Sequence, residues 1–493
     1  MPTLNSRAVR RWIPILACLC AVGVPLGCTR RPATDPGLVS AWVHALYGAI
    51  RVERLSPPVA SRLAAYAATA LYGGLASVHP DMRALDGVFT GMPSLPRADR
   101  PGDYDATVVA VMAERVVLDS LLQEGLATTR AQLERLADSL DGARVAAGIA
   151  ADVRARSDSL GRRIGLAIVA WSNTDGFTAT RRAYAPPVGD GLWYNDSPAT
   201  VYSTQNLSGA SEFVALDNPA NQQRAGNVSD RGLIMSRPKS ASTKTLPAAN
   251  MAGATEPYWR EVRPFVLKAW NECVIPDPPA YSIDSASVLS GNARAVVDAK
   301  NALTPEQRTI AYYWADNAGE SGTPVGHWMS IASQMISERH LTADKAAELV
   351  LATAVAQADA FIAAWGYKYQ YNLLRPRTYI RRVIDSTWEP LIPTPPFPEH
   401  PAGHSTQSSA AATVITALIG ASPFSDSTSV SIGHAVRHFD SFQAASEEAG
   451  RSRIYGGIHF PSGNESGLTL GRCVGAKVAA ALGVETTSNT GKP

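Results

Sequence analysis

The stretch PFPEHPAGHSTQSSAAATVITALIGA, residues 396–421, joins a proline-rich loop to a run of small residues with helical periodicity. Proline fixes its own φ and restricts the residue before it, so the approach to Gly403 is stiff. The pattern predicts a helix that starts near Gly403, with His404 in its first turn. The first N–H groups of a helix lack partners within it and carry partial positive charge. The stretch is therefore compatible with an anion site at a helix start, or with a surface loop before a buried helix.

Two further segments carry cations at short spacing. In WGYKYQYNLLRPRTYI, residues 365–380, Lys368 and Arg375 are two helical turns apart and lie on nearly the same face. In GRSRIYGGIHFPSGNESG, residues 450–467, Arg453 and His459 flank a Tyr-Gly-Gly sequence. Each segment alone is compatible with solvated surface cations or structural histidines. Arginine binds oxyanions bidentately, lysine acts as a point charge and histidine exchanges protons near neutral pH, so together the segments can surround one tetrahedral oxyanion.

An oxyanion site of this composition supports two chemistries. In the first, one histidine attacks phosphorus and the other protonates the leaving group, which gives phosphoester hydrolysis. In the second, a histidine ligates the oxyanion of a metal that activates an oxidant. The residue types alone do not choose between them.

The three segments resemble the three-part signature of the vanadium-dependent haloperoxidase and type 2 phosphatidic acid phosphatase superfamily. The matching elements are Lys368-x6-Arg375-Pro376, Pro401-Ala402-Gly403-His404 and Ser452-Arg453-x5-His459, in that order. The resemblance covers roughly residues 260–484 and implies a vanadate cofactor or a phosphate substrate. It implies that His404 is the acid–base group and that His459 is the vanadium ligand, or the phosphorylated nucleophile of a phosphatase. It further implies that the anion's oxygens are held by Lys368, Arg375, Arg453 and the Gly403 N–H.

Three further positions resemble the haloperoxidase side of the superfamily. Trp365 and Phe397 are similar to the aromatic lining of a halide pocket. Asp316, in YYWADNAGESGTP (residues 312–324), resembles an acid that pairs with the second arginine, which here is Arg453. The same three residues are also compatible with core packing and a surface acid.

The chain departs from the family pattern at two positions. Ala402 stands where the family has serine, so a hydroxyl hydrogen bond to the oxyanion is missing. Gly463 stands where the family often has an acid that hydrogen-bonds the ligand histidine. We expect Asn464 to take that place through its amide or its backbone carbonyl.

The composition predicts a globular, all-α protein. The 493 residues are 45% hydrophobic and 18% charged, aromatic residues make up 7%, and strand-like alternation is scarce. With the resemblance, the expected fold is a large helical bundle of the vanadium haloperoxidase type. The formal charge of +2 does not favour nucleic acid as a partner. After the N-terminal segment we find no apolar run of the length that spans a bilayer.

The predicted organisation has six parts. Residues 1–28 resemble a bacterial export signal, with a basic start and an apolar run that ends at Gly27-Cys28. The protein is therefore expected to be periplasmic, either free or anchored as a lipoprotein through Cys28. The other parts are a linker (29–37), a helical region (38–172), an irregular segment rich in Asn, Ser, Gly and Pro (173–255), a helical core (256–484) and a flexible tail (485–493).

Two cysteines remain after the signal and its Cys28, namely Cys273 and Cys473. Two cysteines are too few for a disulfide framework or a zinc site of their own. They are compatible with a single bridge in an oxidising compartment or with two separate thiols.

Three functions remain in competition. The leading hypothesis is a vanadate-dependent haloperoxidase that oxidises halide with hydrogen peroxide and passes the product to a small organic acceptor. The second is a soluble acid-phosphatase-like hydrolase that uses the same residues on a phosphate ester. The third is a non-catalytic anion-binding scaffold. The apolar helical faces within residues 38–172 are also compatible with a homodimer.

Overall fold

The computed structural model describes residues 34–196 and 253–484. The export signal with Cys28, most of the linker and of the irregular segment, and the C-terminal tail lie outside these ranges. The N-terminal helices of the described part are α1 (Gly37–Val52), α2 (Pro57–Ala76), α3 (Ala106–Leu121), α4 (Ala127–Ala146) and α5 (Ala151–Ser172). The C-terminal helices are α7 (Val288–Asn301), α8 (Pro305–Tyr313), α9 (Thr323–Glu338), α10 (Ala343–Tyr371), α11 (Pro376–Val383), α12 (Gly403–Ile419), α13 (Phe442–Tyr455) and α14 (Pro461–Ala481).

Short elements complete the described part. They are four 3₁₀ helices, η1 (Pro101–Asp103), η2 (Phe177–Thr180), η5 (Trp259–Glu261) and η6 (Thr428–Ile432), and two strands, β1 (Phe424–Asp426) and β2 (Arg437–Phe439). The strands pair antiparallel, with Phe424 opposite Phe439. The all-α prediction is confirmed, because this hairpin is the one sheet in the described residues.

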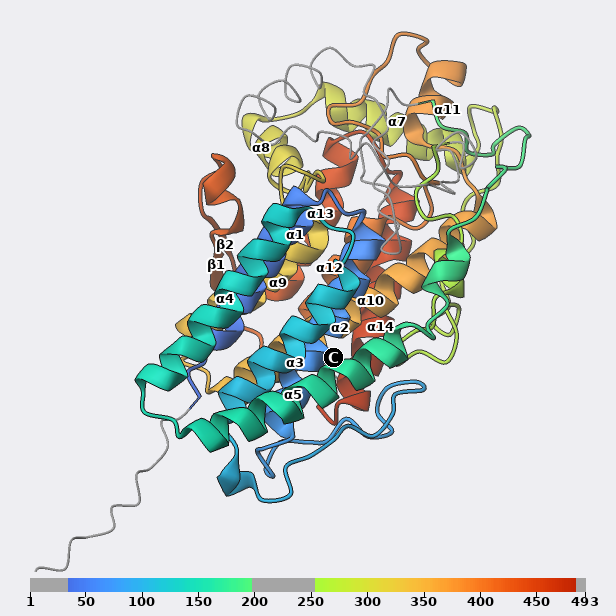
Figure 1. The fold of residues 1–493 in the computed structure, drawn as a ribbon. Helices are drawn as coiled ribbons and strands as arrows, with labels where there is room; N and C mark the ends of the chain where they lie inside the picture. Colours follow the sequence, from blue (N-terminus) through green and yellow to red (C-terminus); the bar gives the residue numbers. More distant parts are fainter. Residues whose placement is uncertain (1–33, 197–252, 485–493) are drawn as a thin grey trace, which may run out of the picture. The chain divides into compact units, whose positions relative to one another are not determined.

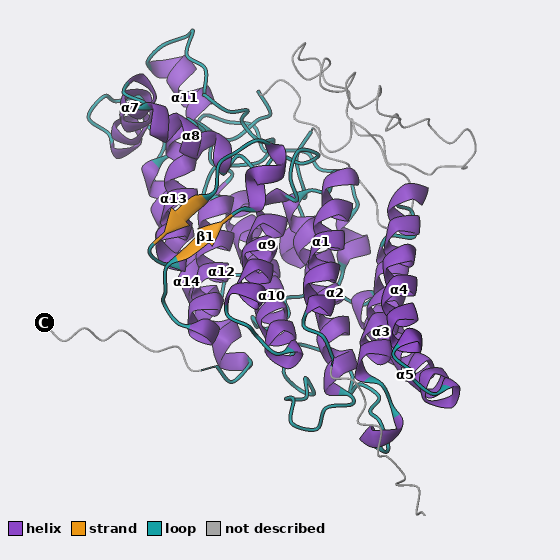
Figure 2. Ribbon diagram, turned by 90° about the vertical axis from the view of Figure 1, so that its left-hand side faces the viewer, coloured by secondary structure: helices purple, strands orange, loops and turns teal. Residues whose placement is uncertain are grey.

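The helices form two neighbouring groups joined through α2 and α10. Figure 2 shows α1–α5 on one side, α9, α10 and α12–α14 on the other, and α7, α8 and α11 gathered at one end. α10 packs against α2 on one side and against α12 and α14 on the other, so segments far apart in sequence lie side by side (Figure 1). The core residues of both groups belong to one continuous apolar cluster.

Helix α10 is the central helix of this core. Within the described residues it is the one helix long and apolar enough to cross a bilayer, with a mean hydropathy of 1.5 over its most apolar window. The expectation that no such run follows the signal was therefore wrong. All of that window is buried among the other helices, so α10 serves as the core helix of the bundle.

Glycines let α14 approach the backbone of α12. Gly467, Gly471 and Gly475 recur every four residues and so form one stripe along α14. A Cβ added at Gly471 would lie 2.1 Å from the Thr406 carbonyl oxygen, and one added at Gly467 or Gly475 would lie 2.7 Å from a carbonyl oxygen of the α12 N-cap or of α12 itself. The two helices therefore touch through their backbones. The start of α12 and the start of α14 are held together as a result.

Residues 262–287, which fall within the predicted helical core of 256–484, are not helical. Beyond η5 they form an irregular strap, and the next α-helix is α7 at Val288. Prolines at 264, 276, 278 and 279 interrupt any helical hydrogen-bond ladder. The buried carboxylate of Asp359 on α10 instead accepts the backbone N–H groups of Phe265, Val266 and Leu267, at 2.7, 2.8 and 2.9 Å.

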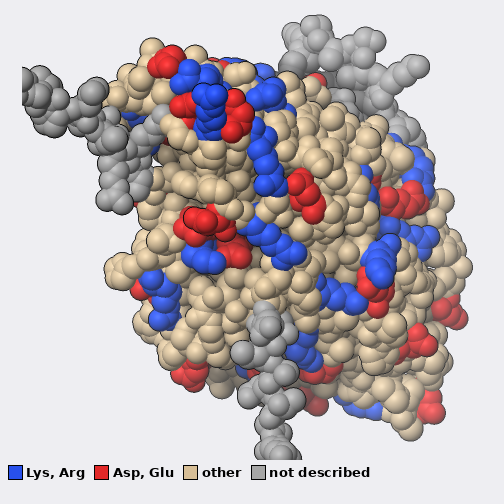
Figure 3. All heavy atoms as spheres, turned by 90° about the horizontal axis from the view of Figure 1, so that it is seen from below, with Lys and Arg blue, Asp and Glu red and all other residues tan. Residues whose placement is uncertain are grey.

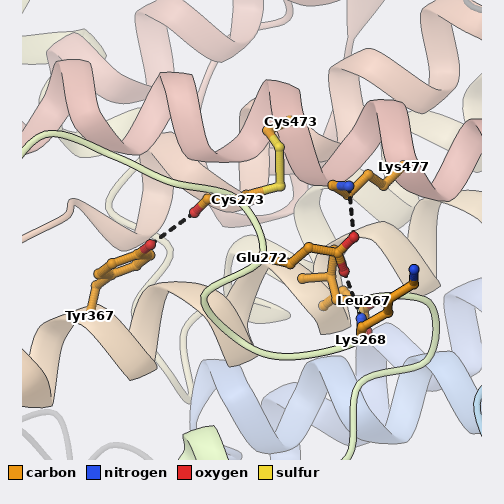
Figure 4. The surroundings of a disulfide bond; sticks show 8 residues. Leu267, Lys268, Glu272, Cys273, Tyr367, Cys473 and Lys477 are labelled. Atoms are coloured by element: carbon orange, nitrogen blue, oxygen red, sulfur yellow. Dashed lines mark hydrogen bonds and ion pairs between the residues drawn. A yellow bond between two sulfur atoms is a disulfide. The ribbon is translucent and has the colours of Figure 1, made fainter.

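A disulfide fastens this strap to α14. Cys273 and Cys473 are bridged across 200 residues of sequence, which decides between the two alternatives left open above. Figure 4 shows Cys273 on the strap and Cys473 on α14, with the Tyr367 hydroxyl of α10 donating to the Cys273 carbonyl at 3.0 Å. Lys477 forms an ion pair with Glu272 at 2.8 Å beside the bridge. The strap is thus tied to both α10 and α14.

The charged surface has no dominant sign on the face drawn in Figure 3. Lys and Arg side chains lie interspersed with Asp and Glu over that face. Many are paired on the helix surfaces, as Arg115 is with Glu134 and Asp138. This distribution agrees with the formal charge of +2.

Candidate active site

Five separate elements place the predicted cations and histidines around one buried spot. Lys368 lies in the last turn of α10 and Arg375 caps the start of α11. His404 lies in the first turn of α12 and Arg453 in the last turn of α13, while His459 lies two residues before the start of α14. Lys368, Arg375, Arg453 and His404 all lie close enough to depress the pKa of the buried His459 imidazole.

Lys368 is fully buried and held by backbone carbonyls. Its Nζ donates to the carbonyl oxygens of Pro398, Glu399 and Pro401, at 3.0, 2.9 and 2.5 Å. Burial and the neighbouring Arg375 push the pKa of Lys368 below its usual range, and Glu399 opposes them. Three carbonyl acceptors need the three protons of an ammonium group, so the contacts favour the charged form.

Arg375 fixes the tautomer of His459. Its Nη1 lies 2.9 Å from His459 Nε2 and donates to the Ile458 carbonyl at 2.8 Å. Guanidinium nitrogens only donate, so Nε2 must be the acceptor nitrogen of the ring. Burial and the adjacent Arg375 lower the pKa of His459 well below its ordinary value. The ring is therefore neutral, with its proton on Nδ1 and a lone pair on Nε2 directed at the cations.

Glu399 accepts the Nδ1 proton of His459. Its Oε1 lies 2.9 Å from His459 Nδ1 and also accepts the backbone N–H of Phe460 at 2.9 Å. The carboxyl is completely buried, and burial raises its pKa to about 7 against the opposing charges of Lys368 and Arg375. A carboxylate on the second nitrogen fixes the orientation and the basicity of a ligand histidine.

Gly463 provides the space that Glu399 occupies. A Cβ added at Gly463 would lie 2.3 Å from Oε1 and 2.8 Å from Oε2 of Glu399. The family pattern has an acid at the position of Gly463. In this chain the carboxylate of Glu399, from the loop before α12, fills the volume that such a side chain would need. Asn464, which we expected in this role, instead accepts a hydrogen bond from Ser405 at 2.7 Å. That expectation was wrong, since the carboxylate comes from a different element.

His404 faces the same spot from α12. Its Nε2 is buried and has no hydrogen-bond partner among the described residues, and the nearest carboxylate oxygen is Asp316 Oδ2 at 3.9 Å. Burial, together with the charges of Arg453, His327 and Lys368, lowers the pKa of His404 well below its ordinary value. The neutral ring presents a nitrogen that is open to a ligand atom.

The carboxylate of Asp316 lies against two histidines. It is 3.0 Å from His327 Nδ1 and 3.9 Å from His404 Nε2, and its pairing with Arg453 stays a prediction. The Nη1 of Arg453 donates to the carbonyl of Trp314, at 2.7 Å, two residues before Asp316. The loop that carries Asp316 thus approaches Arg453 through its backbone.

Trp365 and Phe397 form an aromatic wall beside the cations. Their ring centroids are 4.9 Å apart, and both rings are buried. The Lys368 Nζ lies 5.1 Å, and the Arg375 guanidinium carbon 4.8 Å, from the Phe397 centroid. This wall keeps water from the apolar side of the site and strengthens the charges within it.

Ala402 caps α12 without a side-chain hydrogen bond. It is fully buried, and its N–H donates to the Gly463 carbonyl at 2.9 Å. The N–H groups of Gly403 and the residues after it therefore begin the helix with no partner within its own ladder. A Cβ added at Gly403 would lie 3.4 Å from the Trp365 ring and 3.9 Å from the stem of Lys368, so the start of α12 lies beside these two residues.

The structure brings the predicted cations together and adds two buried partners that the sequence did not reveal. Glu399 stands inside the PFPEH sequence, and an acid so close to His404 was a signal in a chain that lacks one at 463. His327 lies in an apolar stretch of α9 and is completely buried. A lone histidine on an apolar helix gives no sign of the acids that surround it.

The donor set fits a tetrahedral oxyanion such as vanadate. Three buried cations, an N–H at a helix start and two neutral histidine nitrogens converge on one spot. The open Nε2 of His404 is a buried polar atom that a ligand atom would satisfy. The lone pair of His459 Nε2 is available to a metal centre once Arg375 donates to an oxygen of the anion instead.

Comparisons with known proteins agree with this fold. Residues 348–484 match the family described as "VCPO second helical-bundle domain". A bacterial vanadium-dependent iodoperoxidase aligns with a TM-score of 0.73 and 29% identity, over 92% of this chain and 98% of that chain. No curated protein sequence matches this chain.

Two structures of bacterial vanadium-dependent chloroperoxidase also align. The apo-type structure has a TM-score of 0.60 and 14% identity, over 87% of this chain and 94% of that chain. The holo-type structure has a TM-score of 0.54 and 15% identity, over 91% and 93%. At these identities the two structures share the fold with this chain.

Proposed function

Because this chain belongs to the vanadium haloperoxidase superfamily, we propose that it is a haloperoxidase, which oxidises halide ions with hydrogen peroxide at a vanadate bound to His459. The observation that carries the proposal is the His459 ring. Its Nδ1 is engaged by Glu399 and its Nε2 lone pair points into the cation cluster. Vanadate would supply a Lewis-acid centre that activates peroxide without a change in its own oxidation state.

Each group of residues at the site would have a separate role. Arg375 and Arg453 would hold the oxygens of the anion, with the Gly403 N–H as a further donor. Lys368, whose three protons go to backbone carbonyls, would contribute its positive charge. His404 would hold or release a proton at Nε2, which has no other partner among the described residues. The wall of Trp365 and Phe397 would exclude water on the side where halide arrives.

Hydrolysis of phosphate esters is the alternative. The same lone pair on His459 Nε2 can attack phosphorus, and His404 can protonate the leaving group. The geometry of the cations serves either anion. The similarity to the iodoperoxidase favours halide oxidation, and it makes iodide the first halide to test.

Parallel assays separate the two functions. The purified protein is assayed for iodide oxidation and for halogenation of monochlorodimedone with hydrogen peroxide, with and without orthovanadate. Hydrolysis of p-nitrophenyl phosphate is measured on the same preparation. We expect halide oxidation that depends on added vanadate, and its loss in His459→Ala and His404→Ala.

The matched control is His438→Gln, a variant of an exposed histidine on β2. It should retain full activity. Halide oxidation that needs no vanadate, or ester hydrolysis as the one activity present, would overturn the haloperoxidase proposal. If His404→Ala kept its activity in both assays, His404 would have no part in the mechanism.

We further propose that the protein acts outside the cytoplasm. The predicted export signal and the Cys273–Cys473 bridge support this location, since disulfides persist in oxidising compartments. Attachment through Cys28 would add a lipid anchor. Mass spectrometry of the N-terminal peptide from the membrane fraction tests the anchor.

A further inference from the structure

His327 lies between two carboxylates in the interior of the protein. Its Nδ1 is 3.0 Å from both oxygens of Asp316, and its Nε2 is 2.8 Å from Asp426 Oδ2. The ring has no exposed surface. A neutral imidazole carries one N–H and can donate to only one of these acids, whereas an imidazolium donates to both. The contacts therefore fit a cation.

The two acids stabilise that cation. Burial lowers the pKa of His327, but Asp316 and Asp426 outweigh it and raise the pKa to about 10. Burial likewise works against ionisation of Asp426, yet His327 and the Thr428 N–H hold its pKa at about 2. Two carboxylates and one imidazolium leave the cluster with a net charge of −1.

Rigid neighbours hold the cluster in place. The Trp314 ring stacks on the His327 ring with centroids 4.4 Å apart and an interplanar angle of 15°. Asp426 accepts the Thr428 N–H at 2.9 Å, and the Tyr313 hydroxyl donates to the Asp426 carbonyl at 3.2 Å. The backbone of Asp316 has a φ of +48°, a left-handed conformation that turns the loop toward α9.

Asp316 connects this cluster to the candidate active site. One carboxylate oxygen, Oδ2, lies 3.0 Å from His327 Nδ1 and 3.9 Å from His404 Nε2. The acid is thus shared between a fixed cation and the proposed acid–base group. Trp314, which stacks on His327, also accepts the Arg453 hydrogen bond.

We propose that His327 is a positioning residue, a permanent cation that holds the Asp316 carboxyl group in place beside His404 and links it to Asp426 on the hairpin. The inference rests on the proposed function, in which His404 is the acid–base group. Without the cation, two carboxylates would share one buried space, so one of them would take up a proton. Asp316 would then no longer be held in its place 3.9 Å from His404 Nε2.

The first test is a pair of variants. His327→Gln leaves two facing acids with no cation between them, whereas His327→Gln with Asp426→Asn also removes one of the two acids. We expect the single variant to lower kcat for halide oxidation about 10- to 100-fold, with a smaller change in the KM for peroxide. The double variant should recover most of kcat. A packing role predicts the opposite order, because the double variant alters two core residues.

The second test does not depend on activity. Nitrogen-15 NMR of histidine-labelled wild-type protein at pH 8 should show one of the nine histidines with both ring nitrogens protonated. The signal should be absent in His327→Gln and unchanged in His438→Gln. A neutral His327, or a double variant no more active than the single one, overturns this inference. If His327 is charged but the wild-type protein oxidises no halide, the proposed function is overturned and this inference is not. The same variants are then compared by p-nitrophenyl phosphate hydrolysis.

Discussion

At the scale of single residues, Glu399 and Gly463 act as a complementary pair. The carboxyl of Glu399 fills the space that a side chain at 463 would need, and it binds the nitrogen of His459 that faces away from the cations. His459, the proposed vanadate ligand, therefore has a carboxylate partner although the local sequence lacks an acid. Glycine is needed at position 463 because the Glu399 carboxyl group approaches its backbone closely, and not because the backbone there has an unusual angle.

We predict that Glu399→Ala weakens vanadate binding by about 10- to 100-fold, the usual effect of removing a carboxylate behind a ligand histidine. Titration of the purified protein with orthovanadate, followed by activity or by vanadium-51 NMR, measures the change. Gly463→Asp alone should fold poorly, because its Cβ would lie 2.3 Å from Glu399.

The combination Glu399→Ala with Gly463→Asp returns an acid to the same volume and should regain part of the affinity. Glu465→Gln, which alters an exposed acid on α14, is the control and should bind vanadate normally. If the double variant binds no better than Glu399→Ala, the two positions are not interchangeable.

At the scale of elements, the contact between α12 and α14 sets the distance between the two proposed catalytic histidines. His404 starts one helix and His459 precedes the other, and glycines bring the two helices together. A small displacement of either helix would move its histidine by a similar amount. The stripe of glycines therefore supports the site from a distance.

We predict that Gly471→Ala destabilises the protein by about 1–3 kcal/mol, because its Cβ would overlap the Thr406 carbonyl at 2.1 Å. Urea denaturation measures the free energy of unfolding. Gly142→Ala, in α4, is the control, since its Cβ would meet nothing within 4 Å. That variant should be neutral or slightly stabilising, because alanine favours helix. Equal effects of the two substitutions would contradict the close contact.

The strap over α10 gives a prediction of pH dependence. Burial raises the pKa of Asp359 to about 6, although three N–H groups oppose it. Its unfolded pKa is about 3.9, so the stabilisation is fully present below that pH and is lost as the pH rises through 6. The two values differ by about 2 units, which corresponds to about 3 kcal/mol.

Asp359→Asn removes this titration. Between pH 4 and pH 6 the wild type should therefore lose stability, whereas the variant should not. The advantage of the wild type in unfolding free energy should decrease over this range. The variant should be less stable at pH 4, because its amide nitrogen cannot accept the N–H groups of the strap. A difference that is constant with pH would show that Asp359 titrates normally.

At the scale of the whole molecule, one covalent bond closes most of the described C-terminal half into a loop. The Cys273–Cys473 bridge spans 200 residues and includes every residue of the candidate site. In the chain-entropy account a loop of that length stabilises the folded state by about 5 kcal/mol.

We predict that Cys273→Ser with Cys473→Ser lowers the free energy of unfolding by up to this amount, and that dithiothreitol has the same effect on wild type. Denaturation with and without reductant checks both. Dithiothreitol should leave the double variant unchanged, and an effect on the variant would point to another target of the reductant.

The cations and histidines that the structure brings together could be singled out in the sequence because their order and spacing form a linear pattern. Lys368, Arg375, His404, Arg453 and His459 each occupy a fixed place in a short motif. Glu399 and His327 were missed because their roles depend on which distant side chains face them. The strap at 262–287 was assigned to helix because periodicity was weighed more heavily than its prolines.

The place of Glu399 also affects how related sequences are recognised. A pattern that requires an acid four residues after the ligand histidine would reject this chain, although the carboxylate is present in space. A pattern that accepts glycine at that place, when a glutamate stands five residues before the Gly-His histidine, would retain such chains. A search that considers positions 399 and 463 together would thus group sequences in which the histidine at position 459 has a carboxylate partner, whichever segment supplies it.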